Sequence, residues 1–150
     1  MLSRILLAAA AGMVLCAPVS GHVTVLPRES ATGAYEKYAV RVPTEGKVAT
    51  TSIELTVPEG VSVVSIGAPA GFTYELKRTG ERVTAIVWSM KINPGEFAEF
   101  AFVARNPKAP AEIAWKAVQR FSDGTSTEWI GPRGDNHPAS VTRVIERSTS

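Results

Sequence analysis

The stretch Ser52-Ile53-Glu54-Leu55-Thr56-Val57-Pro58-Glu59-Gly60 decides the fold, because its apolar and polar side chains alternate until a proline and a glycine interrupt them. Side chains two apart lie on the same face of a β-strand, so Ile53, Leu55 and Val57 form an apolar face that is opposite to a polar one. Proline and glycine then supply turn chemistry. The stretch predicts a half-buried strand that ends in a turn.

The same pattern continues along most of the chain. Apolar residues alternate with polar ones, and glycine, proline or asparagine clusters interrupt them about every ten residues, as in β-sandwiches and barrels. We expect an all-β, antiparallel β-sandwich of the immunoglobulin-like or cupredoxin-like kind, with seven or eight strands and almost no helix. The other segments with this pattern are 38–42, 61–66, 72–76, 83–88, 97–103, 113–118 and 141–145.

The first 21 residues predict a secretion signal. One basic residue, Arg4, precedes the apolar run 5–16, and the small residues Val19 and Gly21 occupy the positions that a signal peptidase reads. The run is shorter than the roughly 20 residues of a membrane span. Leu15 precedes Cys16 where a bacterial lipoprotein signal has glycine or alanine. We therefore expect cleavage between Gly21 and His22, and a periplasmic or secreted protein without a membrane anchor in the mature chain.

Cleavage at that point places His22 at the amino terminus of the mature chain. Its α-amine and imidazole Nδ1 then offer two nitrogen ligands from one residue, and such donors suit Cu(II) by ligand type and by the affinity order of divalent metals. Both kinds of group lose their protons near neutral pH, so metal binding is expected to weaken in mild acid.

Composition narrows the function further. The lone cysteine lies in the predicted signal, so the mature chain has neither a disulfide nor a thiolate ligand. Without Arg4, 15 basic residues of the 16 balance 14 acidic ones and form no basic stripe, which argues against a nucleic-acid partner. We expect one domain over residues 22–146, followed by a polar tail at 147–150.

Five local sequences carry a resemblance to a known family. In chain order they are HVTVLP (22–27), RVPTE (41–45), VWSMKINPGEFAEFAF (87–102), WKAVQRFSDG (115–124) and EWIGPRGDNHPA (128–139). Together they span essentially the whole predicted mature chain, which resembles the YcnI-like family of exported bacterial copper-binding domains.

The resemblance implies a β-sandwich that binds one Cu(II) per chain through a single-histidine brace. In this sequence His22 matches the terminal histidine, Glu45 matches the carboxylate ligand and Trp129 matches the tryptophan that overlies the metal. Glu36 lies nearby in the sequence, and the chain alone leaves open which carboxylate points toward His22. The implied function is copper sequestration or delivery without catalysis, with copper-trafficking or cuproenzyme-assembly proteins as partners.

Two other functions stay open. If His137, in the loop Asn136-His137-Pro138, reached His22, a two-histidine brace would indicate a copper-dependent oxidative enzyme. Fold alone does not settle function, so a metal-free immunoglobulin-like interaction module is the other alternative. We expect Trp88 and Trp115 to pack in the core, because both lie within alternating strands, whereas Trp129 lies at a strand end where sites are commonly placed.

Overall fold

The computed structural model describes residues 21–148, and these form strands, turns and loops without a helix. Within that range, no helix is therefore long and apolar enough to cross a membrane. The predicted signal peptide lies outside the described residues except for Gly21. The strands are β1 (Thr24–Leu26), β2 (Glu29–Ala31), β3 (Tyr35–Pro43), β4 (Thr50–Thr56), β5 (Ser62–Ile66), β6 (Thr73–Thr79), β7 (Arg82–Ile92), β8 (Phe97–Arg105), β9 (Ala111–Trp115), β10 (Ala117–Phe121), β11 (Ser126–Trp129) and β12 (Ser140–Ile145).

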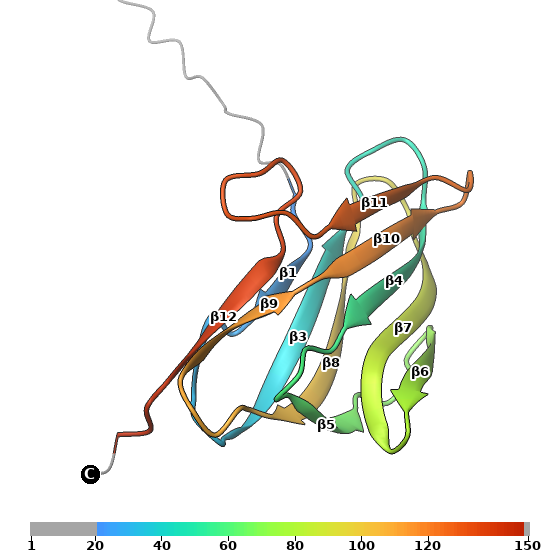
Figure 1. Ribbon diagram of the computed structural model, residues 1–150. Helices are drawn as coiled ribbons and strands as arrows, with labels where there is room; N and C mark the ends of the chain where they lie inside the picture. The colour runs from blue at the N-terminus through green and yellow to red at the C-terminus, as the bar shows by residue number, and fades with distance from the viewer. Residues whose placement is uncertain (1–20, 149–150) are drawn as a thin grey trace, which may run out of the picture.

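The strands form three sheets, which build the two layers of a sandwich. A four-stranded sheet has the order β1-β3-β8-β5, a five-stranded sheet has the order β11-β10-β4-β7-β6, and a three-stranded sheet has the order β2-β12-β9. In Figure 1, β9 of the three-stranded sheet and β10 of the five-stranded sheet pass in front of β3 and β8. These two sheets therefore form one layer, and the four-stranded sheet forms the other. All pairs are antiparallel except β2 with β12, which is parallel. The predicted all-β sandwich is confirmed.

Aromatic rings link the layers through the core. Trp88 of β7 stacks on Phe100 of β8 with ring centroids 5.4 Å apart, and Tyr38 of β3 lies 4.9 Å from Trp115 of β9. Trp88 and Trp115 are fully buried, as predicted, because both point inward from alternating strands. The residues on the apolar face of β4 are buried as well, so the alternation that predicts this strand also predicts its orientation.

The expected number of strands, seven or eight, is too low, because the structure has twelve. Three of the additional strands, β1, β2 and β11, contain only three or four residues, too few for alternation to identify them. The fourth arises because the segment 113–118 divides at Lys116. Before it, β9 pairs with β12, and after it, β10 pairs with β4 and β11. Burial alternates without a break through this change of sheet, so the sequence pattern gives no sign of it.

Candidate metal site at one end of the sandwich

Four segments that are distant in sequence meet at one end of the sandwich, which is the upper end in Figure 1. They are the chain that leads into β1, the loop 44–49 after β3, the hairpin of β10 and β11, and the loop 130–139 before β12. These segments carry all three predicted site residues, His22, Glu45 and Trp129. Loops at the end of a rigid sandwich are a common location for a binding site.

His22 lies two residues before β1 and is partly buried. The next residue, Val23, is buried in the core and fixes where the chain enters the sheet. The His22 ring centroid is 5.5 Å from that of Trp129, at an interplanar angle of 53°. The predicted histidine and tryptophan are therefore neighbours, although 107 positions separate them in the sequence.

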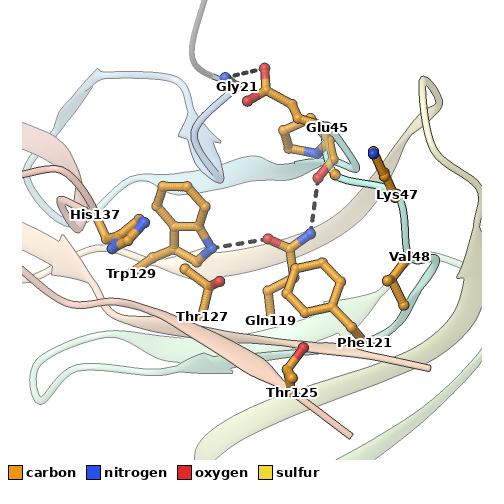
Figure 2. Close-up of a pocket in the computed structure, with 12 residues that line it drawn as sticks. Gly21, Glu45, Lys47, Val48, Gln119, Phe121, Thr125, Thr127, Trp129 and His137 are labelled. Carbon is orange, nitrogen blue, oxygen red and sulfur yellow. Dashed lines mark hydrogen bonds between the residues drawn. The ribbon is translucent and has the colours of Figure 1, made fainter. Parts of the chain in front are cut away.

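Glu45 follows β3 and turns its carboxylate toward the backbone just before His22. Its Oε1 accepts a hydrogen bond from the Gly21 amide N–H, as the dashed line in Figure 2 marks. The Thr44 N–H donates a hydrogen bond to the Glu96 carbonyl, and the Thr44 carbonyl accepts one from the Gly95 N–H. These two bonds hold the start of the loop in place.

Glu36 lies elsewhere. It is the second residue of β3, whereas Glu45 follows the other end of this strand, and the seven residues from Glu36 to Pro43 rise by about 23 Å. The Glu36 carboxylate accepts a hydrogen bond from the Ser30 hydroxyl. Of the two carboxylates that the sequence leaves open, only Glu45 lies beside the chain at His22.

Trp129 is the last residue of β11, and its side chain is 7 % exposed. It therefore belongs to the buried core while it also contacts His22, so the strand-end prediction describes only part of its role. The indole N–H donates a hydrogen bond of 3.1 Å to Oε1 of Gln119, which lies diagonally across the β10–β11 pair. The hairpin that brings these two residues together turns at Gly124, whose φ of +84° favours glycine.

Gln119 is a site residue that sequence reasoning missed. Its Nε2 donates to the Pro43 carbonyl at 2.9 Å and to the Thr50 hydroxyl at 2.8 Å, while its Oε1 accepts from Trp129. One buried amide thus connects the tryptophan to the strand end that precedes Glu45 (Figure 2). A signal was present in the sequence, because alternation from Ile113 places a glutamine on the inward face of the strand, where a polar side chain needs partners.

His137 is exposed, as expected for a loop residue, but its ring lies against Trp129. The two ring centroids are 5.1 Å apart in an edge-on arrangement. The loop returns on itself through a hydrogen bond of 2.9 Å from the Gly131 N–H to the His137 carbonyl. Both imidazoles of the described chain therefore contact the same indole, from opposite ends of the sequence.

The donors at this end fit a small nitrogen and oxygen site. Within residues 21–148, no three His, Cys, Asp or Glu side chains gather as a cluster that could hold a metal. A brace needs only one imidazole and one carboxylate, because the third donor is the α-amine of the terminal histidine. The Glu45 carboxylate accepts a hydrogen bond from the backbone N–H of the residue before His22, so it lies beside the backbone at His22.

The sequence profile of a domain of unknown function, DUF1775, matches residues 22–144. The chain belongs to the DUF1775 family. The chain is also 34% identical, over 131 residues, to the copper-binding protein CutI of Bacillus subtilis strain 168. That alignment covers 85% of this chain but 64% of CutI, so the chain spans less than two thirds of this relative. The predicted YcnI-like resemblance is confirmed.

Solved structures support the immunoglobulin-like architecture. An uncharacterized protein from Nocardia farcinica with an immunoglobulin-like fold superposes on the DUF1775 domain with a TM-score of 0.73 and 28% identity. The match covers 82% of this chain and 97% of that protein. A cohesin module of a Clostridium perfringens glycoside hydrolase matches with a TM-score of 0.50 and 13% identity, over 85% of this chain and all of the module. The second likeness concerns the fold alone.

Proposed function

We propose that this DUF1775 domain is an exported copper-binding protein that sequesters or delivers Cu(II) and does not act as a catalyst. The mature chain begins at His22 and binds one Cu(II) through the α-amine and imidazole of His22 and the carboxylate of Glu45. The observation that carries the proposal is the position of the Glu45 carboxylate against the backbone that leads into His22. The name and 34% identity of CutI support copper as the metal.

The donor types favour the oxidised ion. Two nitrogens and a carboxylate oxygen suit the tetragonal geometry of Cu(II), whereas Cu(I) prefers sulfur and Ca²⁺ or Mg²⁺ needs more oxygens. The indole N–H of Trp129 is already engaged by Gln119, so the ring offers His22 only its apolar surface. In our proposal this surface holds the imidazole and excludes water from one side of the metal.

Processing between Gly21 and His22 changes two of the three protein donors, the α-amine and the Glu45 carboxylate. In the precursor, residue 22 contributes an amide nitrogen, and the Gly21 N–H occupies Glu45. Cleavage converts that amide nitrogen into a free amine and removes the hydrogen bond from the carboxylate. The precursor is therefore expected to bind copper far more weakly than the mature chain.

Expression of the precursor in a secreting host, followed by intact-mass measurement, tests whether the mature chain begins at His22. Competition titration against a chelator of known affinity then compares wild type with His22→Ala and, as the matched control, His137→Ala. We expect one tight Cu(II) site in wild type, loss of that site in His22→Ala and little change in His137→Ala. Equal weak binding by all three proteins would contradict the proposal and favour a metal-free interaction module.

A second candidate function rests on the contact between His137 and Trp129. If copper binding depended on both imidazoles, the site would be a two-histidine brace, and an oxidative enzyme would be the better interpretation. A loss of affinity in His137→Ala as large as that in His22→Ala, together with copper-dependent consumption of oxygen in the presence of a reductant, would favour it.

A further inference from the structure

A pocket opens beside Glu45 and Trp129. The proposed copper ligands do not need this pocket in order to hold the metal. It has a volume of ≈ 330 Å³, and Figure 2 shows it between the loop that carries Lys47 and Val48 and the hairpin that carries Gln119 and Thr127. A volume of this order is at the small end of small-molecule sites. Gly21 lies at its edge, so removal of the signal peptide would widen the pocket on the side of His22.

The walls of the pocket differ in character. Val48, Phe121 and Pro43 supply apolar surface, and the polar atoms of Gln119 are already occupied by hydrogen bonds within the protein. The charges come from the loop after β3, where Glu45 contributes an anion and Lys47, two residues later, contributes a cation.

Within residues 21–148, Lys47 makes no ion pair. Lys47 also lines the pocket, so its ammonium can pair with an anionic group there. The hydroxyl of Thr127, on the hairpin side, is a further polar group at the wall. With Glu45 on copper, a ligand that complements this pocket has a nitrogen donor for the metal, a carboxylate for Lys47 a few atoms away, and little bulk.

We propose that the pocket binds a small α-amino acid beside the copper ion, with the carboxylate at Lys47 and the amino nitrogen on the side of Glu45. This inference rests on the proposed copper site and deepens it. The three donors from His22 and Glu45 leave one position of a four-donor tetragonal set, and an amino nitrogen is a suitable fourth donor. The ammonium proton passes to solvent when this nitrogen binds copper. The domain thus accepts or releases Cu(II) together with an amino-acid ligand.

A glycine titration of the mature chain loaded with one equivalent of Cu(II) tests the proposal. Electron paramagnetic resonance with ¹⁵N-glycine detects a new nitrogen on the metal, and ultrafiltration shows whether copper stays with the protein. The variant Lys47→Gln removes the cation, and Lys91→Gln, an exposed lysine on β7, is the matched control. Imidazole is the control probe, because it can fill the open position without a carboxylate.

We expect glycine to bind wild type and Lys91→Gln equally and Lys47→Gln more weakly, by up to about fivefold, the upper limit for an exposed ion pair. Imidazole should bind all three proteins alike. The proposal would be overturned if glycine only stripped copper from the protein, or if Lys47→Gln bound glycine as well as wild type. Those results leave the copper site standing, whereas absence of a one-to-one Cu(II) site in wild type would remove the proposed function and this inference together.

Discussion

Replacement of Gln119 by leucine removes three hydrogen bonds from the buried end of the sandwich without opening a large cavity. The Gln119 side chain is 2 % exposed and bonds to the Pro43 carbonyl, the Thr50 hydroxyl and the Trp129 indole. Thr50 keeps a partner in the Thr44 hydroxyl, but the indole N–H and the Pro43 carbonyl each lose one. Since an unsatisfied buried polar group costs about 1–3 kcal/mol, we expect the free energy of unfolding to fall by about 3 kcal/mol.

Differential scanning calorimetry and urea unfolding of the metal-free protein measure this loss. For a domain of this size, about 3 kcal/mol corresponds to a melting temperature roughly 12 °C lower. Arg120→Leu on the same strand is the matched control, because Arg120 points outward to an exposed pair with Glu54 at 3.2 Å, for which about 1 kcal/mol or less is expected. If Gln119→Leu melted within 2–3 °C of Arg120→Leu, a difference below about 1 kcal/mol, the hydrogen bonds of Gln119 would not fix Trp129 in the way argued above.

Three further predictions concern the site and the core. Glu45→Gln should weaken Cu(II) binding about tenfold, equivalent to ~1.4 kcal/mol, while Glu36→Gln leaves the affinity unchanged. A competition titration in which Glu36→Gln causes the larger loss would identify Glu36, and not Glu45, as the carboxylate ligand. Trp129→Phe should shift the visible Cu(II) absorption and also lower stability by about 1–3 kcal/mol, because Gln119 Oε1 loses its donor; an unchanged melting curve would argue against that hydrogen bond. Burial raises the pKa of Tyr38 to about 12, with a smaller contribution from the Glu36 carboxylate, so the folded chain keeps the phenol protonated where the unfolded chain loses it. Stability should therefore fall between about pH 10 and 12, by ~1 kcal/mol at pH 11, and urea midpoints should show no such added loss in Tyr38→Phe.

The fold was predictable wherever one strand face is buried and the other is solvated. The alternation around Ile53 and Leu55 in β4 predicts both the strand and its inward face. The change of sheet at Lys116 was not predictable, because a strand that leaves one sheet for another keeps its period of two. Short strands such as β1 owe their existence to pairing with β3, which is a long-range contact and leaves no local pattern.

The family resemblance supplies the candidate site residues, whereas the contacts that position them come from the structure. The family resemblance favours Glu45 over Glu36 only by motif, whereas their positions at opposite ends of β3 show that Glu45 alone lies beside the chain at His22. Trp129 was expected at a strand end, but it is also buried, and its indole N–H donates a hydrogen bond to Gln119 across the hairpin. The contact of His137 with the indole depends on how the loop 130–139 closes, which no local pattern in the sequence reveals.

The most direct test of the proposed site is a Cu(II) titration of the mature chain that begins at His22, followed by electron paramagnetic resonance beside the same chain acetylated at its α-amine. We predict a one-to-one tetragonal signal with nitrogen and oxygen ligands in the free chain, and loss of that signal on acetylation, because the amine is one of the donors. An identical signal and affinity in both forms would contradict a copper site at the amino terminus.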